Sequence, residues 1–328
     1  MAMERVPYLV GGGFEHSAEV MRAMLAAATS GAEGIVNAGD MKVAATEVPG
    51  TSVRIAPGNA LIRNSYGGGT AQTYACRAAS QTELAITATG SSGSRTDLVV
   101  ARINDPTYAG GEFDPTTFQA ADFAVIQGVP AGTSSVAGLN LGYPAIPLAR
   151  ITLPASTGTV TNAMITDLRS VALPRVQRHL FTHGLTAGEG ADELNRPTAA
   201  PPDGEAWPNV FWQVNIPLWA QRVRIRGIWA QVRVEQKTPN NYGKLWVRIG
   251  TMADGFSSQQ VNWDIATTGG IARQTWVVAD DRTVPKSFRG TSRQVYLRGS
   301  TTNENSNVPR LDSVSAISLD LEFYETAV

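Results

Sequence analysis

Short runs of β-branched and apolar residues, each bounded by turn-forming residues, recur along the chain and constrain its fold most. The clearest two are 97–103 (Asp-Leu-Val-Val-Ala-Arg-Ile) and 146–153 (Ile-Pro-Leu-Ala-Arg-Ile-Thr-Leu). Both place an arginine between alanine and isoleucine, so we expect two buried strands of one sheet, each with one charged position. Many short strands at this spacing indicate an all-β sandwich or barrel.

Similar runs divide the chain into two β-rich parts. In the first part we expect strands at 41–47, 52–56, 59–63, 71–77, 82–87, 97–103, 122–127, 146–153 and 160–168. In the second we expect them at 209–215, 222–234, 244–250, 274–279, 293–298 and 314–324. Apolar and polar residues alternate almost strictly in 222–226 and 317–323, which places one face in a core and the other in water. The second part is therefore predicted to be a β-sandwich of jelly-roll type.

Residues 17–31 form the one convincing helix. Ser17 can cap it, Glu19 complements its first turn and Gly31 ends it. One face carries an apolar stripe made of Val20, Met21, Met24, Leu25 and Ala28. This stripe either docks on a partner subunit or covers the sheet of its own domain. The preceding residues 1–15, with Pro7 and a triplet of glycines at 11–13, predict an extended, flexible arm.

The predicted organisation is mainly β, with four parts. An arm and helix (1–33) precede a β-sandwich or barrel domain (34–173), a Gly/Pro linker (174–206) and a C-terminal jelly-roll-like β-sandwich (207–328). Four glycines and four prolines give the third part its linker composition. Its stretch 176–181 could still pair or coil with neighbouring copies.

Composition and charge exclude several partners. The formal net charge is −1, with −3 before Leu173 and +2 after it, so neither half has the basic surface that binds nucleic acid. No apolar run approaches the roughly 20 residues that span a bilayer, and the N-terminus lacks a Sec signal pattern. We expect synthesis in a cytoplasm and no membrane insertion. Cys76 is the single cysteine, which excludes an intrachain disulfide and favours a buried structural thiol.

Catalytic and metal-binding patterns are weak throughout. His179 and His183 stand four residues apart, but Gly184 follows at once and the zinc-protease motif is absent, so a linker pair of histidines is the better interpretation. The carboxylates at 280–281, and those at 320, 322 and 325, form no obvious pair in a cleft. We therefore expect no enzyme, no cofactor and no metal, with a glycan hydrolase as the lesser alternative.

Charged residues inside the apolar runs predict a structural role. Asp97, Arg102, Arg150 and Arg169 are expected to form an ion-paired cluster that fixes strand register or an interface, because buried charges are tolerated mainly in pairs.

Glycan contacts are possible in the second part, which holds all seven tryptophans. Most tryptophans in a β-sandwich belong to its core or to interfaces, whereas exposed rings can stack on sugars. The polar stretches around Asn240 and Asn303 suit sugar hydrogen bonds but are also ordinary turns. The candidate contacts are Trp219, Tyr242, Trp263, Asn303 and Asn305.

Five ordered motifs carry a resemblance that covers roughly residues 15–173. They are Gly-Asp-Met-Lys-Val (39–43), Val-Arg-Ile-Ala-Pro-Gly-Asn-Ala-Leu-Ile (53–62), Arg-Thr-Asp-Leu-Val-Val-Ala-Arg-Ile (95–103), Ile-Pro-Leu-Ala-Arg-Ile (146–151) and Thr-Asp-Leu-Arg (166–169). This set resembles the minor tail or upper-baseplate proteins of siphophages that infect actinobacteria.

The resemblance implies a multimeric virion protein at the tail tip, without a cofactor and assembled in the host bacterial cytoplasm. Its N-terminal part would dock among copies of itself and other tail proteins, and its C-terminal part would face the host surface, with cell-wall glycan as a possible partner. A trimer is the expectation from the family. The alternatives are a carbohydrate-binding module protein and, less favoured, a tail-spike glycan hydrolase.

Overall fold

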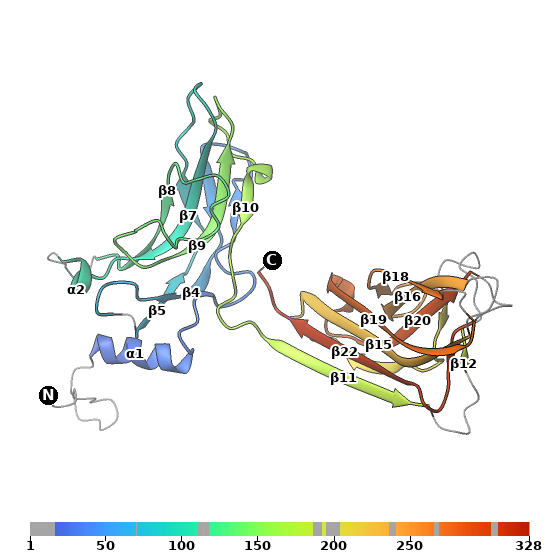
Figure 1. Cartoon of the computed structure of the whole chain (residues 1–328). Helices are drawn as coiled ribbons and strands as arrows, with labels where there is room; N and C mark the ends of the chain where they lie inside the picture. The colour runs from blue at the N-terminus through green and yellow to red at the C-terminus, as the bar shows by residue number, and fades with distance from the viewer. Residues whose placement is uncertain are drawn as a thin grey trace. The chain divides into compact units, whose positions relative to one another are not determined.

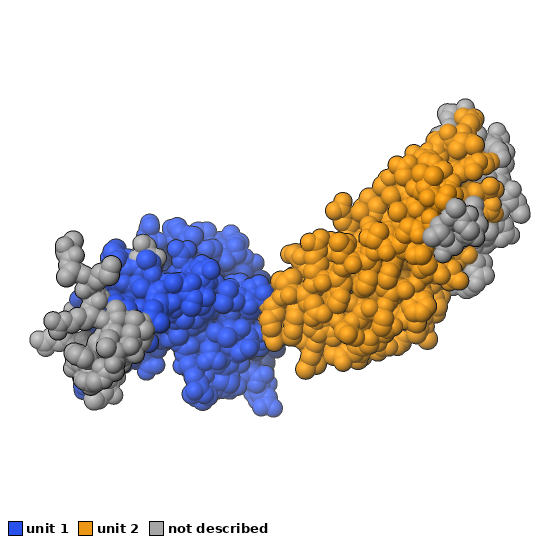
Figure 2. Space-filling view, turned by 90° about the horizontal axis from the view of Figure 1, so that it is seen from below, with its two compact units in different colours: residues 1–174, 326–328 blue, residues 175–325 orange. Residues whose placement is uncertain are grey.

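The structure, a computed structural model, is mainly β with one longer helix near the N-terminus (Figure 1). It describes residues 17–69, 71–110, 114, 118–185, 192–194, 204–235, 241–265, 269–302 and 308–327. The predicted arm at 1–15 lies outside these residues. The chain divides into unit 1, residues 1–174 with 326–328, and unit 2, residues 175–325 (Figure 2).

Helix α1 (Ala18–Ala28) confirms the predicted helix and its ends. The Ser17 hydroxyl accepts a hydrogen bond from the Val20 N–H, at 3.4 Å, as an N-terminal cap does. After the last turn, Gly31 has a φ of 67° and its N–H donates to the Ala26 carbonyl at 2.8 Å. Only glycine adopts this left-handed conformation without steric cost, so it ends the helix where the sequence predicts.

Unit 1 consists of three antiparallel sheets beside α1. The first contains β1 (Gly34–Ile35), β4 (Gly58–Arg63) and β5 (Thr73–Ala78), and the second β2 (Val43–Ala45), β3 (Ser52–Ile55) and β6 (Thr82–Ala85). The third has the order β10 (Ile165–Asp167), β9 (Ala145–Leu153), β7 (Arg95–Ile103) and β8 (Ala121–Ile126). A one-turn helix, α2 (Pro106–Ala109), follows β7. All nine runs predicted in this part contain a strand.

The two arginine-bearing runs are the neighbouring strands β7 and β9, as predicted. Val99 lies opposite Ala149 while Val100 lies opposite Pro147, so Leu148 is an extra residue in a bulge. The bulge explains how a proline, which has no N–H to donate, is tolerated inside a sheet. Nearly every residue of β7 is buried, since its two faces contribute to different apolar clusters, and this accounts for its continuous apolar run.

Unit 2 has the strand order of a jelly roll. One sheet contains β11 (Val176–Gly184), β22 (Ala316–Tyr324), β15 (Arg222–Glu235) and β19 (Ile271–Thr283), in that order. The other contains β14 (Trp212–Asn215), β20 (Ser292–Thr301), β16 (Asn241–Ile249) and β18 (Val261–Ile265). Short strands extend both sheets: β12 (Asp192–Glu193), β13 (Glu205–Ala206), β17 (Phe256–Ser257) and β21 (Arg310–Leu311).

Numbered along the chain, these eight main strands run 1-8-3-6 in one sheet and 2-7-4-5 in the other, which is the eight-stranded jelly-roll arrangement of two Greek keys. The jelly-roll prediction is confirmed.

The linker prediction is wrong for residues 176–184, because they form β11, the first strand of the jelly roll. This strand pairs with β22 over its whole length. Its inward positions include Gln177, His179 and Phe181, all half-buried, so it lacks the apolar alternation that marks a strand in sequence. The C-terminal boundary also differs, since residues 326–328 belong to unit 1 and Ala327 packs on its core.

Candidate functional site

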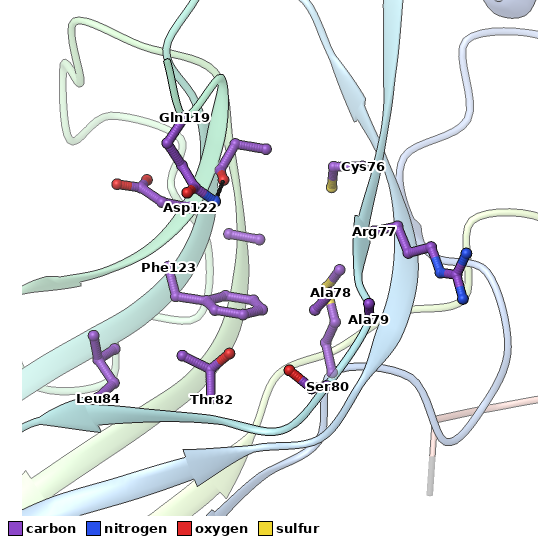
Figure 3. Close-up of a pocket in the computed structure, with 13 residues that line it drawn as sticks. Cys76, Arg77, Ala78, Ala79, Ser80, Thr82, Leu84, Gln119, Asp122 and Phe123 are labelled. Carbon is purple, nitrogen blue, oxygen red and sulfur yellow. Dashed lines mark hydrogen bonds between the residues drawn. The ribbon is translucent and has the colours of Figure 1, made fainter. Parts of the chain in front are cut away.

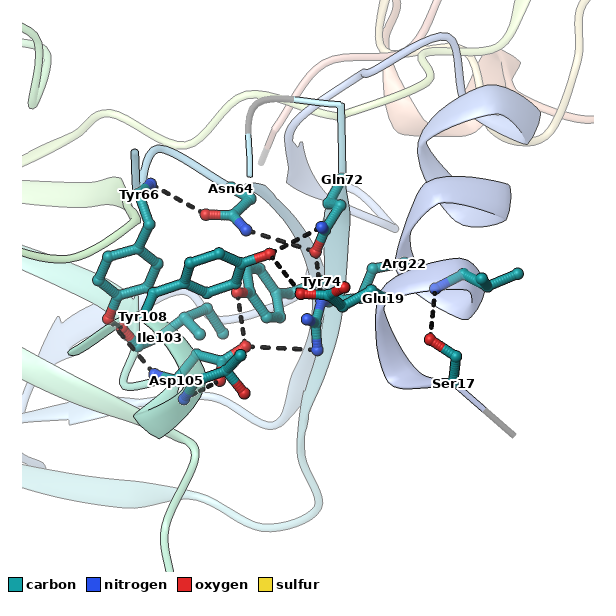
Figure 4. A network of polar contacts seen from close by, with 12 residues as sticks. Ser17, Glu19, Arg22, Asn64, Tyr66, Gln72, Tyr74, Ile103, Asp105 and Tyr108 are labelled. Carbon is teal, nitrogen blue, oxygen red and sulfur yellow. Dashed lines mark hydrogen bonds and ion pairs between the residues drawn. The ribbon is translucent and has the colours of Figure 1, made fainter. Parts of the chain in front are cut away.

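Helix α1 docks on unit 1 through polar side chains (Figure 4). The Arg22 guanidinium donates from Nε to Gln72 Oε1 at 2.6 Å, and its Nη1 lies 3.3 Å from Asp105 Oδ2. On the neighbouring turn, Glu19 Oε1 accepts a hydrogen bond from the Tyr108 hydroxyl at 3.1 Å. The face of the helix that lies against the sheet is therefore its charged face.

Asp105 is the centre of this polar network. It caps α2 by accepting from the Thr107 N–H at 2.9 Å, and its Oδ2 accepts from the Tyr74 hydroxyl at 2.8 Å. Arg22 lies over the Tyr74 ring, 5.0 Å from the centroid. Burial by itself raises the pKa of Asp105, but the hydrogen bonds from Tyr74 and Thr107 and the charge of Arg22 together hold that pKa below its usual range. The same burial and hydrogen bond raise the pKa of Tyr74 far above its usual value.

Apolar packing contributes little to holding the helix. Under its second half lies a shallow hollow of about 430 Å³, walled on the helix side by Ala23, Ala26 and Ala27 and on the sheet side by residues that include Thr73. Alanine side chains are too short to fill the space between a helix and a sheet. The polar network is therefore the main attachment of α1.

The apolar stripe of α1 is covered only in part, because Val20 and Leu25 are half-buried whereas Met21, Met24 and Ala28 are exposed. Met21 and Met24 are 47% and 45% exposed, and no residue of the helix is fully buried. Docking of this stripe on a partner stays a prediction. Exposed methionines suit a contact surface, since their flexible side chains adapt to a facing surface.

The predicted ion-paired cluster is instead a set of separate contacts. Asp97 pairs with Arg95, Arg102 with its cross-strand neighbour Asp122, and Arg169 with Asp167, at 2.6–2.8 Å. Arg150 donates to the Thr133 carbonyl at 3.3 Å. Pairing is confirmed for Asp97, Arg102 and Arg169. The four predicted charges do not form one cluster, because each contacts a different partner.

Asp97 is the most buried of these charges and supports a prediction. It accepts two hydrogen bonds from Arg95, both at 2.8 Å, and one from the Gly128 N–H at 3.1 Å, so it connects β7 to the turn after β8. Asp97→Asn keeps the shape and loses the charge. We expect this variant to lower the stability of unit 1 by about 2 kcal/mol, measured by denaturant unfolding. Unchanged stability would contradict a structural role for the pair.

The candidate glycan contacts do not form one surface among the described residues. Trp263 is buried, with 4% of its surface exposed, and its indole N–H donates to the Ser300 carbonyl, so the prediction of an exposed ring that contacts a glycan is wrong for this residue. Trp219 is half-buried beneath the Arg175 guanidinium, 5.3 Å away. Tyr242 is 55% exposed, and Asn303 and Asn305 lie outside the described residues. Neither tryptophan presents a free ring face to a sugar.

The histidine pair lies on β11 and not on a helix. Four residues along a strand separate His179 and His183 by about 13 Å, which is too far for shared coordination. Within the described ranges there is no group of three or more His, Cys, Asp or Glu side chains placed to hold a metal ion, and no helix long and apolar enough to cross a membrane.

Glu325 has a structural role that its sequence context does not indicate. The sequence places it on the solvent side of the last strand, but its side chain is buried and pairs with Arg175 through Nη2–Oε1 at 2.6 Å and Nε–Oε2 at 2.9 Å. The Glu325 N–H also donates to the Arg175 carbonyl at 3.0 Å. This pair joins the first and last residues of unit 2.

No family model and no curated protein matches the chain. Among solved structures, infectious bursal disease virus of the Gx strain shares 12% identity, covering 89% of this chain and 70% of that one, with a TM-score of 0.24. The VP2 subviral particle of the same virus shares 12% identity over 94% and 78%, with a TM-score of 0.23. Carbohydrate-binding modules of the β-sandwich superfamily share 9% identity over 90% and 96%, with a TM-score of 0.16. Scores this low carry no argument, so the fold assignment depends on the strand order alone.

Proposed function

We propose that this chain is a structural protein of a bacteriophage virion, at the tail tip or baseplate, and not an enzyme. Unit 1 docks among copies of itself and other tail proteins, and unit 2 presents its jelly roll to the host surface. Two lines support this proposal: the ordered motifs that resemble siphophage tail proteins, and a helix that exposes Met21 and Met24.

The two exposed methionines of α1 are the observation that carries the proposal. A short helix held to its own unit by Arg22 and Glu19 exposes Met21 and Met24 at the spacing of one helical face. Exposed apolar surface of this kind is unfavourable for a monomer in water, and its burial against another apolar surface lowers the free energy. Self-association through α1 is the simplest use of this arrangement, and closed rotational symmetry is the expected result.

We expect the double substitution Met21→Asp with Met24→Asp to reduce the self-association of the purified protein at least tenfold, because it places two charges in the contact. Light scattering coupled to gel filtration gives the mass of the particle. Met252→Asp is the matched control, since Met252 is equally exposed, at 45%, but lies in unit 2. A multimer that survives the double substitution would contradict the role of α1.

The position in the virion requires its own measurement. Gold-labelled antibodies against unit 2 should decorate the distal tail in electron micrographs of phage particles. A protein that is monomeric and absent from particles would contradict the proposed function as a whole.

The carbohydrate-binding alternative is not favoured. The candidate tryptophans are covered, and Tyr242 is the one described candidate with an exposed ring.

A further inference from the structure

Unit 1 contains a cleft of about 490 Å³, shown in Figure 3, but its best candidates for ligand contact are already engaged or uncharged. Asp122 is paired with Arg102 at 2.6 Å, and Gln119 donates to the Ala121 carbonyl at 2.9 Å. Burial raises the pKa of Cys76 to about 11, so its thiol is uncharged near neutral pH. These groups do not specify a ligand, whereas the edge of the jelly roll in unit 2 specifies a partner.

Strand β11 is an edge of its sheet, since among the described residues it pairs with β22 alone (Figure 1). Just beyond its ends, the Glu325 N–H donates to the Arg175 carbonyl at 3.0 Å and the Leu185 N–H donates to the Ser315 carbonyl at 3.5 Å. Hydrogen-bonded and non-hydrogen-bonded pairs alternate along an antiparallel ladder, so the odd-numbered residues of β11 are bonded to β22. The backbone N–H and C=O groups of the even-numbered residues therefore point to the free edge: Val176, Arg178, Leu180, Thr182 and Gly184.

This edge lacks the features that usually protect an edge strand from pairing with another chain. β11 is nine residues long, contains neither proline nor lysine, and pairs with β22 without a bulge. Its one charged outward residue, Arg178, is held by Asp320 through two hydrogen bonds, at 2.7 and 2.5 Å. The opposite edge strand, β19, is protected, because its pairing with β15 contains a bulge and because Asp280, Asp281 and Arg282 follow one another along it.

The outward side chains of β11 also favour pairing. Val176 and Leu180 are 55% and 67% exposed, although both are apolar. A second strand beside β11 would cover part of this apolar surface and would also satisfy the free backbone groups.

The sequence of β11 is complementary to itself. Leu180 is the middle residue of the strand, so a twofold axis at this residue pairs all nine residues with those of a second β11. On the outward face, Leu180 then lies opposite Leu180, Arg178 opposite Thr182 and Val176 opposite Gly184, with no like charges opposed. An axis at Arg178 would place two guanidinium groups opposite each other, which is unfavourable, and would shorten the ladder to residues 176–180.

We infer that β11 pairs with β11 of a second copy of this chain, antiparallel about a twofold axis at Leu180, so that the two jelly-roll sheets continue into each other. The contact is a strip about 30 Å long and about 10 Å wide. This is well below the area of about 800 Å² per partner that a stable interface buries, so the contact alone is too weak to hold a dimer through gel filtration. It adds to contacts made elsewhere between the chains. Since α1 belongs to unit 1, failure of this inference would leave the proposed function standing.

A cysteine at the middle of β11 tests the pairing in the full chain. Leu180→Cys should form a disulfide-linked dimer under mild oxidation at high protein concentration, because the Cα atoms of a hydrogen-bonded pair lie about 5.5 Å apart, within reach of a disulfide. Val277→Cys is the matched control, at an exposed residue of the other edge strand, and should link at least tenfold more slowly. The native chain, whose single cysteine is Cys76, gives the background rate. Equal rates for the two variants would overturn the inference, as would faster linking between the two variants than within Leu180→Cys.

The register supplies a second test. Across the proposed axis Arg178 lies opposite Thr182, but each of these residues is about 14 Å from its own copy. A mixture of Arg178→Cys and Thr182→Cys chains should therefore form the mixed dimer at least tenfold faster than either chain links to itself. Leu180→Lys added to both chains should slow this linking at least tenfold, because it sets two ammonium groups opposite each other. Self-linking as fast as mixed linking, or no effect of Leu180→Lys, would contradict the pairing about Leu180.

Discussion

Replacing Asp105 with alanine is expected to lower the unfolding free energy of unit 1 by about 3–5 kcal/mol. The substitution leaves the buried guanidinium of Arg22 without its carboxylate and removes the acceptor of the Tyr74 hydroxyl and of the Thr107 N–H. Because these contacts hold α1, the helix should detach before the sheets unfold. Calorimetry measures the transition, and tryptophan fluorescence separates the units, since all seven tryptophans lie in unit 2.

The same carboxylate makes unit 1 sensitive to acid. The pKa of Asp105 is lower in the folded chain than in the unfolded one, so its contribution is present above the unfolded pKa and is lost as the pH falls through the folded pKa. Asp105→Asn should be less stable than the native chain at pH 7, and the difference should shrink as the pH falls below the usual range of an aspartate. An equal difference at pH 7 and pH 2 would contradict the ionised pair.

Replacing Arg175 with alanine is expected to destabilise unit 2 by about 1–3 kcal/mol, the cost of leaving a buried acceptor without its donor. The side chain of Arg175 is half-exposed, while that of Glu325 is buried. Loss of the arginine therefore leaves a buried carboxylate without its guanidinium, which destabilises the fold more than leaving a half-exposed arginine without its carboxylate. Denaturant unfolding followed by tryptophan fluorescence gives the value for unit 2 alone.

Arg178→Ala is the matched control for this prediction. Arg178 also pairs with a carboxylate, Asp320, but its side chain is 60% exposed, and solvent screens such a surface pair, so we expect a much smaller loss of stability. Equal losses in the two variants would contradict the special role of the Arg175–Glu325 pair.

The β architecture was predictable from sequence because the burial of one or both faces of a strand determines the pattern of its apolar residues. β7 is buried on both faces, so its sequence is continuously apolar, whereas β22 alternates because only one face meets the core. The strand β11 leaves no such mark, since glutamine and histidine occupy inward positions at the edge of the sheet. Its role as the first jelly-roll strand depends on pairing with a segment about 140 residues later, which local pattern does not encode.

The candidate site was predictable only in part. Periodicity shows which residues of α1 share a face, but it cannot tell which face turns inward, and here the inward face is the one with Glu19 and Arg22. The role of Asp105, the partner of Arg22, could have been found from neighbouring residues: Asp105-Pro106 is a helix cap followed by a proline in the first turn. Trp263 was misjudged because a short polar context does not reveal that the neighbouring strands enclose its ring.

The adjacency of the two ends of unit 2 has an evolutionary consequence. The chain leaves unit 1 after Pro174 and returns to it at Thr326, and Arg175 and Glu325, the residues just inside, are hydrogen-bonded to each other. The jelly roll is thus an insertion between two neighbouring points of one backbone. Recombination can exchange such a cassette for another domain whose ends lie equally close, while the coding sequence for 1–174 and for the last three residues stays intact. The jelly roll can therefore diversify without changing unit 1.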